Sequence, residues 1–100
     1  MNNDRLLSFL GICKRAGRLV SGADTVTKAV NEGKAKLVLY ASDVSENSVK
    51  QVLRAAQQNG VFAKQLNYSK DELSFALGRH CGIICTTDDG FAEKMLEIID

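Results

Sequence analysis

The sequence contains no proline and no tryptophan, few aromatic residues and a single histidine, and it has no long apolar run. A membrane-spanning helix needs roughly 20 consecutive apolar residues, and no run in the chain approaches that length. The segment from Met1 to Arg5 also lacks the basic and then apolar order of a secretory signal. We therefore expect a cytoplasmic protein without membrane segments.

Cysteine and metal-binding patterns are equally sparse. Cys13, Cys81 and Cys85 are odd in number, they form no Cys-x-x-Cys pair, and His80 is the lone histidine. Disulfide frameworks use paired cysteines, and zinc sites use closely spaced cysteine and histidine ligands. The sequence therefore predicts buried or idle thiols, no bound metal and no cofactor.

Catalytic motifs are also missing. There is no Gly-x-Gly-x-x-Gly, no Walker loop, and no acid and nucleophile spaced near His80. One enzymatic pattern remains open, because Asp43, Asp88 and Asp89 follow two predicted strands, where carboxylates could hold Mg²⁺ for phosphoryl transfer. The same acids stand at predicted helix starts, where they favour the helix dipole. We interpret them as helix caps and expect no catalytic residues.

Helical and strand signals alternate along the whole chain, and 100 residues with 45% apolar content suit one domain, residues 1–100. Apolar residues at helical spacing run from Leu6 to Cys13, Val26 to Val30, Val49 to Ala56, Leu73 to Leu77 and Phe91 to Ile99. The predicted strands are Arg18–Ser21, Leu37–Ala41, part of 61–66, and Ile83–Thr86. Five helices and four strands predict a three-layer α/β/α sandwich around a mixed, largely parallel sheet. Periodicity does not decide whether the short first strand joins the parallel strands or lies antiparallel at an edge.

Side-chain caps are expected at several helix starts. Asn3 or Asp4 is expected to cap the first helix, and Ser21 or Asp24 the second. Ser69 and Glu72 form the spacing of a capping box ahead of the fourth helix.

Charge is unevenly distributed although the net charge is only +1. Residues 1–41 hold seven basic and three acidic residues, whereas the remainder holds six basic and nine acidic residues. Such asymmetry can produce a basic face that an anionic polymer would recognise. Ordinary solvated charge would give the same counts.

The helix that follows Gly22 is the best candidate binding site. Gly22 lets a partner approach the backbone, exposed amides at a helix start favour anions, and Lys28 projects from the first turns. Thr25 offers a hydroxyl and Asp24 a carboxylate that can accept from guanine N–H groups. Five basic residues nearby in sequence could contact phosphates: Lys14, Arg15, Arg18, Lys34 and Lys36. A plain capped helix with solvated lysines is the competing interpretation.

A second candidate is the loop from Leu77 to Gly82. Gly78 and Gly82 free its backbone, Arg79 can pair with phosphate or stack on a base, and His80 can also stack. A simple connector between a helix and a strand would look much the same.

Two segments, Ser21–Val30 and Gly33–Ser45, resemble the L7Ae family of ribosomal and kink-turn-binding proteins. The likeness continues through the turn at Gly60, the helix Glu72–Gly78 and the segment Thr87–Phe91, and so covers nearly the whole chain. The run from Lys14 to Gly22 and the segment from Asp89 to Ala92 most resemble the bacterial YlxQ branch of that family.

This resemblance implies an α/β/α fold in which the helix after Gly22 enters the widened groove of a kink-turn and reads tandem sheared G·A pairs. The loop before the last strand would hold the extruded nucleotides. In the typical motif, Asn-Glu-x-x-Lys does the reading. Lys28 keeps the lysine here, whereas Asp24 and Thr25 replace the asparagine and the glutamate, which changes the donors offered to guanine and brings a negative charge near phosphate.

The function expected from residues and resemblance together is non-catalytic binding of kink-turn-like structured RNA, ribosomal or another non-coding or regulatory RNA, by a monomer that could act on the ribosome. The expected RNA-binding residues are Gly22, Asp24, Thr25, Lys28, Arg18, Lys34, Lys36, Arg79 and His80. The alternative is a protein-interaction or assembly module that has kept the fold and lost specific RNA binding.

Overall fold

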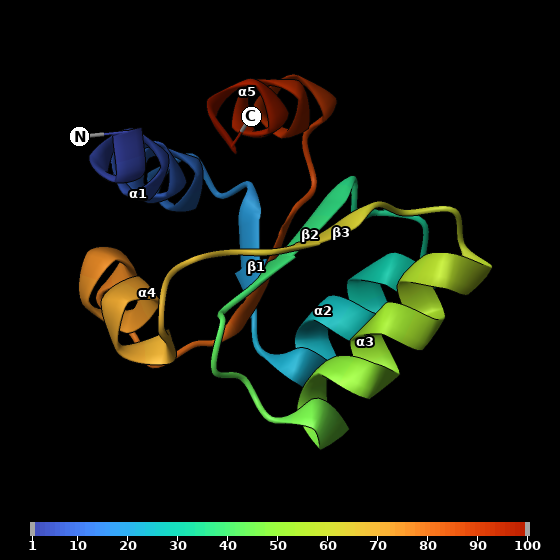
Figure 1. Cartoon of the computed structure of the whole chain (residues 1–100). Helices are drawn as coiled ribbons and strands as arrows, with labels where there is room; N and C mark the ends of the chain where they lie inside the picture. The colour runs from blue at the N-terminus through green and yellow to red at the C-terminus, as the bar shows by residue number, and fades with distance from the viewer. Residues whose placement is uncertain (1, 100) are drawn as a thin grey trace.

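Helices and strands alternate in the computed structural model, which describes the backbone of residues 2–99 and the side chains of residues 5–99 (Figure 1). The elements are α1 (Asn2–Arg15), β1 (Leu19–Ser21), α2 (Ala23–Asn31), β2 (Leu37–Tyr40), α3 (Glu46–Gln58), β3 (Ala63–Gln65), α4 (Lys70–Leu77), β4 (Ile83–Thr86) and α5 (Asp89–Ile99). Each predicted segment is present, with bounds that differ by a few residues.

The four strands form one mixed sheet in the order β1-β4-β2-β3. Only β2 and β3 pair in parallel, since β4 lies antiparallel to both β1 and β2. The first strand, whose direction the sequence left open, lies antiparallel at an edge, and the expectation of a largely parallel sheet is wrong. The reason lies in the loop before β4, where the amides of Gly22 and Ala41 donate to the carbonyls of Ile83 and Gly82. The chain therefore enters β4 at the end where β1 and β2 finish.

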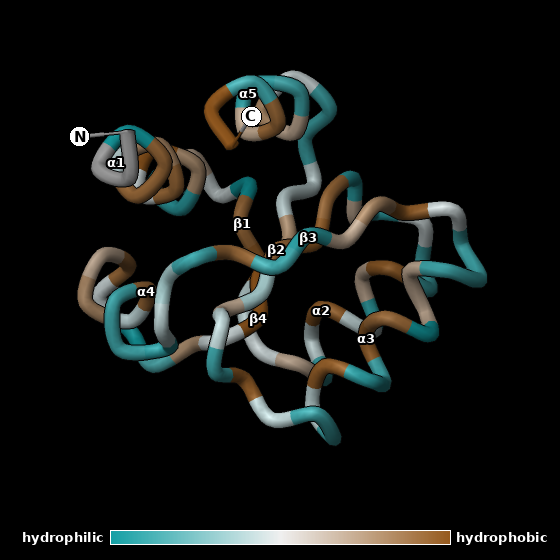
Figure 2. The backbone as a smooth tube through the Cα atoms, in the orientation of Figure 1, coloured by the Kyte–Doolittle hydropathy of each residue, from teal (hydrophilic) through white to brown (hydrophobic). Residues whose placement is uncertain are grey.

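Side chains of β2 alternate between two separate cores. Leu37 and Leu39 pack with residues of α1, α4 and α5, whereas Val38 packs with residues of α2 and α3. Side chains that point alternately to opposite faces of a strand bury both faces of the sheet. Figure 1 shows the result, with α1, α4 and α5 on one side of the strands and α2 and α3 on the other, and Figure 2 shows the apolar strands between them. The three-layer sandwich is confirmed.

Helix starts only partly follow the predicted caps. The Ser69–Glu72 capping box is present, and Ser45 caps α3 by accepting from the amide of Ser48. By contrast, α1 begins at Asn2, so Asn3 and Asp4 lie within the helix rather than at its cap. The N-cap of α2 is Gly22.

No side chain caps α2, so the expectation for Ser21 and Asp24 is wrong. Ser21 is held in β1 opposite Ile84, and Asp24 already lies in the first helical turn. The backbone geometry of the strand end thus leaves the first amides of α2 without a side-chain partner.

All three cysteines are buried and free, as the sequence predicts. Among the described residues, no helix combines the length and apolar character that crossing a membrane would require.

Candidate nucleic-acid interface

The start of α2 depends on an unusual backbone conformation at Gly22. Its φ of 100° and ψ of 139° lie in a region that residues with a side chain rarely adopt. The Gly22 amide donates to the Ile83 carbonyl at 2.9 Å, and the Gly22 carbonyl accepts from the Val26 amide at 2.8 Å. Gly22 therefore turns the chain from strand to helix within one residue while remaining bonded to β4.

Three helix starts meet at one hollow of about 200 Å³. Residues from the beginnings of α2, α3 and α4 and from the loop before β4 line it: Gly22, Ala23, Val44, Ser45, Ser48, Lys70, His80, Gly82 and Ile83. The helix macrodipole places about half a positive charge at each N-terminus. The uncapped start of α2 and the side chain of Lys70 favour an anion at this hollow, whereas Ser45, Ser69 and Asp43 already accept from amides at the starts of α3 and α4.

Internal hydrogen bonds hold the loop before β4 against this hollow. The Ser74 hydroxyl donates to the Cys81 carbonyl at 3.3 Å and accepts from the Cys81 amide at 3.0 Å. At Gly82, an added Cβ would lie only 2.9 Å from Cγ of Lys70, so a larger residue there would force the Lys70 side chain to move. The loop also brings His80 into the lining of the hollow, on which Gly22 at the start of α2 borders.

Charges near the loop come from Arg79 and Lys14. Burial raises the pKa of the Cys81 thiol above its ordinary value, and the positive charges of Arg79 and Lys14 oppose that rise. The Lys14 ammonium donates to the Leu77 carbonyl, which is one of the last carbonyls of α4. Lys14 therefore caps a helix C-terminus. Arg79 and His80 are exposed.

The polar residues of α2 are accessible. Val26, Ala29 and Val30 form the buried stripe of the helix, and Asp24, Thr25 and Lys28 are exposed. The first turn of α2 therefore presents the Asp24 carboxylate and the Thr25 hydroxyl to solvent, and its last turn presents the Lys28 ammonium group. These are the three groups that the sequence predicts as the reading edge.

Arg18, Lys34 and Lys36 lie at the other end of α2. The Arg18 carbonyl accepts from the Thr87 amide, and the Lys36 amide donates to the Thr86 carbonyl. Thr86 ends β4, whereas Ile83, beside Gly22, begins it, and these two residues are about 10 Å apart along a strand. The expectation that the basic neighbours converge where α2 begins is wrong for these three, and their contact with phosphate remains a prediction.

Lys34 has an acidic neighbour of its own. Its ammonium lies 3.3 Å from a carboxylate oxygen of Glu32, and both side chains are well exposed. An exposed pair of this kind contributes little to stability. Replacing the Lys34–Glu32 ion pair with a contact between Lys34 and phosphate therefore costs little free energy.

Sequence reasoning overlooked the residues that α3 and α4 bring to the hollow. Ser45 and Lys70 were not among the expected RNA-binding residues, although both line the site. Their spacing along the chain gives no hint of this, because the position of β4 between β1 and β2 is what gathers the three starts.

The aspartates that could have held Mg²⁺ act as caps. Asp88 Oδ1 accepts from the Phe91 amide at 2.9 Å, at the start of α5. Asp43 Oδ1 accepts from the Lys70 amide at 2.8 Å, and so caps α4 rather than α3. Within the described part of the chain, no group of three potential metal ligands forms.

Comparison with known proteins finds relatives that are named as RNA-binding proteins. The chain is 36% identical over 97 residues to the "RNA-binding protein YlxQ" of Bacillus subtilis (strain 168), covering 92% of both chains. It is 30% identical over 99 residues to the protein of the same name from Enterococcus faecium, covering 99% of this chain and 95% of the relative. These names describe RNA-binding proteins rather than enzymes.

Solved structures show the same fold. A protein of unknown function from Bacillus halodurans C superimposes with a TM-score of 0.88 at 32% identity, covering 95% of this chain and 96% of the other. A Giardia lamblia 15.5kD RNA binding protein gives a TM-score of 0.76 at 25% identity, covering 98% of this chain and 84% of the other. A family model also matches residues 4–96, and the chain accordingly belongs to the ribosomal protein L7Ae/L30e/S12e/Gadd45 family.

Proposed function

We propose that the chain is a non-catalytic protein that binds sharply bent, kink-turn-like RNA at the hollow where α2, α3 and α4 begin. The observation that carries the proposal is the meeting of three helix starts with Lys70 and His80 around about 200 Å³, with the exposed Lys28 further along α2. Backbone amides and positive helix ends bind phosphate. A bent duplex can bring a phosphate and an unpaired base to one such small site.

Each residue at the start of α2 has a distinct role in this proposal. Gly22 allows the RNA backbone to approach the first amides, and Lys28 donates to guanine acceptor atoms. Thr25 supplements that reading with its hydroxyl, and the Asp24 carboxylate accepts from guanine N–H groups. Arg79 and His80 stack against or hold a base extruded by the bend.

Residues at the far end of α2 act as phosphate contacts for an arm of the RNA. Arg18, Lys34 and Lys36 are exposed, and they lie about one β4 strand length from the hollow. An RNA duplex that is bound with one end at Gly22 is long enough to reach these three cations. Such contacts position the RNA without reading its sequence.

The relatives support the general function. Two curated relatives and one similar solved structure carry RNA-binding names, and the family is named after ribosomal proteins. We therefore expect ribosomal or another structured non-coding RNA as the partner, bound by a monomer in the cytoplasm.

A gel-shift comparison tests the proposal. The wild-type chain is titrated into a kink-turn duplex and into a straight duplex with the same arms. Tighter binding of the kinked RNA is expected, and equal binding or none would refute the proposal. Lys28→Ala should cost about 1–3 kcal/mol of binding free energy on the kinked RNA. Lys94→Ala, which removes an exposed lysine from α5 on the opposite layer, is the matched control.

Two observations favour a second function, that of a protein-interaction module. The carboxylate of Asp24 is exposed in the first turn of α2, where it repels phosphate, and Phe75 on α4 is 92% exposed. Exposed aromatic side chains are typical anchors of protein interfaces. Purification from cells with and without nuclease separates the two functions, because partners held through RNA disappear after nuclease and direct protein partners remain.

A further inference from the structure

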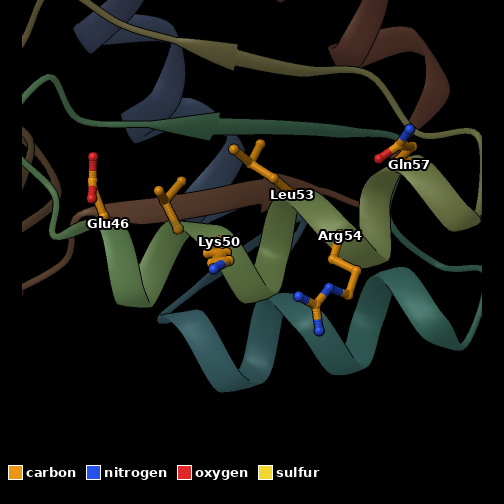
Figure 3. A pocket seen from close by; sticks show the side chains of 6 residues that line it. Glu46, Lys50, Leu53, Arg54 and Gln57 are labelled. Atoms are coloured by element: carbon orange, nitrogen blue, oxygen red, sulfur yellow. The ribbon is translucent and has the colours of Figure 1, made fainter.

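Two exposed cations form a ridge along the outer side of α3. Lys50 and Arg54 are one helical turn apart, and each lines both of two shallow hollows on this helix (Figure 3). The larger hollow, of about 540 Å³, is lined by Glu46, Val49, Lys50, Leu53, Arg54 and Gln57. The smaller, of about 280 Å³, is lined by Asn47, Lys50, Gln51 and Arg54. The ridge thus stands between two depressions that a curved polymer can occupy.

Neither cation of the ridge has an acidic partner. Among the described residues, Lys34 and Glu32 form an ion pair, whereas no carboxylate lies within 4.0 Å of the ammonium of Lys50 or the guanidinium of Arg54. Like charges four residues apart destabilise a helix. An anion bound between them relieves that repulsion.

Lys50 and Arg54 lie on the same solvent-exposed side of the α2–α3 layer as Lys28. Val52, Ala55 and Ala56 are the buried residues of α3, so Lys50 and Arg54 point away from the sheet. In α2 the corresponding buried stripe leaves Lys28 on the outer face. The two helices pack side by side on one face of the sheet, and Figure 3 shows the Arg54 side chain extending toward α2 while Leu53 points toward the strands.

Acidic residues flank this face at its ends, and Glu32, which follows α2 at its C-terminal end, is paired with Lys34. Glu46 lines the larger hollow one turn before Lys50, and Asp24 lies one turn before Lys28. Both acids stand in the first turns of their helices. The middle of the two-helix face is therefore positive, with Lys28, Lys50 and Arg54 at its centre.

We infer that the Lys50–Arg54 ridge of α3 is a second phosphate-binding surface, over which one arm of the bound RNA runs after leaving the hollow at the start of α2. The inference rests on the proposed RNA binding and adds to it a surface on a different helix. Continuity with Lys28 favours a nucleic-acid backbone over an acidic peptide, because one RNA arm reaches both helices. Cations of this kind hold phosphate without reading bases.

The test measures how affinity depends on salt for the full chain and for Lys50→Gln/Arg54→Gln. Each lost phosphate contact lowers the slope of log affinity against log salt by about 1, so the double variant should lower it by about 2. Kinked and straight duplexes with the same arms should lose affinity to the same extent. The matched control, Arg5→Gln/Lys94→Gln, removes the same charge from exposed positions of α1 and α5 on the opposite layer and should leave the slope nearly unchanged.

Arm length gives an independent measurement. A kink-turn RNA with shortened arms should reduce the wild-type slope to that of the double variant and should no longer distinguish the two proteins. An unchanged slope in the double variant, or an equal change in the control, would overturn the inference. If the slope is unchanged in the double variant but Lys28→Ala loses binding of kinked RNA, the inference fails and the proposed function stands. If the wild-type chain binds no RNA, the inference and the proposed function both fail.

Discussion

Asn59 donates a side-chain hydrogen bond to Oδ1 of Asn31 at 3.1 Å, and it joins the C-terminal ends of α2 and α3. At the opposite ends, Gly22 and Ser45 line one hollow, so the two helices run parallel with their starts aligned. Side-by-side parallel helices add their positive ends at the same place. The bond between Asn59 and Asn31 therefore helps to hold α2 and α3 in this parallel arrangement.

Asn59→Ala should weaken this arrangement. The Asn59 amide also donates to the Ala55 carbonyl at 2.9 Å, so the variant loses two exposed or partly exposed bonds. We expect the free energy of unfolding in urea to fall by about 0.5–1.5 kcal/mol. Asn67→Ala, at an exposed position between β3 and α4, is the control and should change stability much less. Equal stability of both variants would mean that the Asn59 bonds contribute nothing.

Gly22→Ala should destabilise the protein through its backbone alone. An added Cβ at Gly22 would come no closer than 3.9 Å to Thr25 Oγ1, so there is space for it. The φ of 100° nevertheless costs a residue with a side chain about 1–3 kcal/mol. We expect a loss of that size in urea unfolding, together with weaker binding of kinked RNA.

The same substitution at Gly11 provides the comparison. Gly11 lies inside α1, has no positive φ, and its added Cβ would meet Arg15 at an ordinary 3.6 Å. In a helix interior, alanine is more favourable than glycine by about 1 kcal/mol. Gly11→Ala should therefore leave the free energy of unfolding unchanged or raise it. A loss of stability at Gly11 equal to that at Gly22 would show that the backbone argument fails.

Local sequence patterns predicted the elements of this fold well. The apolar run Leu37–Leu39 and the capping box at Ser69 depend only on neighbouring residues, and both are confirmed. Strand direction depends on long-range pairing, so the antiparallel position of β4 between β1 and β2 escaped the prediction. The capping error at α2 has a related cause, because pairing of Ser21 with β4 removes it from the cap.

Only the part of the candidate site that is local in sequence could be predicted, because long-range contacts bring the rest together. Lys28, Asp24 and Thr25 are close in sequence, and the helix that contains them exposes all three. His80 and Lys70 reach the hollow only because the loop before β4 returns to the start of α2. Arg18 and Lys36 are near Gly22 along the chain, yet β1 and α2 carry them to the other end. Distance along the chain is a poor guide to distance across a sheet.

Asp24→Asn should strengthen RNA binding. The exposed carboxylate in the first turn of α2 repels phosphate, and an asparagine amide can donate to a guanine oxygen, which a carboxylate cannot. We expect about tenfold tighter binding of a kink-turn duplex, or about 1.4 kcal/mol, in a gel-shift titration. Asp89→Asn, in the first turn of α5, removes the same charge from the opposite layer and should have little effect. An asparagine keeps one oxygen that can accept from a guanine N–H group, so weaker binding by Asp24→Asn would mean that the RNA contact needs the charged carboxylate.

Stability should fall at alkaline pH because of the buried thiols. Burial, and to a smaller extent the negative charge of Asp88, raises the pKa of Cys13 from 9.0 to about 11. Burial alone raises the pKa of Cys85 from 9.0 to about 12. Below pH 9 both states keep these protons. Above it, the unfolded chain releases them while the folded chain does not, so the stabilisation present at lower pH is lost as pH rises toward the folded pKa values.

Each thiol should lower the free energy of unfolding by about 1.4 kcal/mol per pH unit over that range. Urea unfolding at about pH 8, 9.5 and 10.5 measures the slope, and Cys85→Ala should reduce it by the contribution of one thiol. Lysines and tyrosines titrate in both proteins, so the difference between the two slopes isolates Cys85. Identical slopes would mean that Cys85 loses its proton as readily in the folded chain as in the unfolded one, which its 1% exposure argues against.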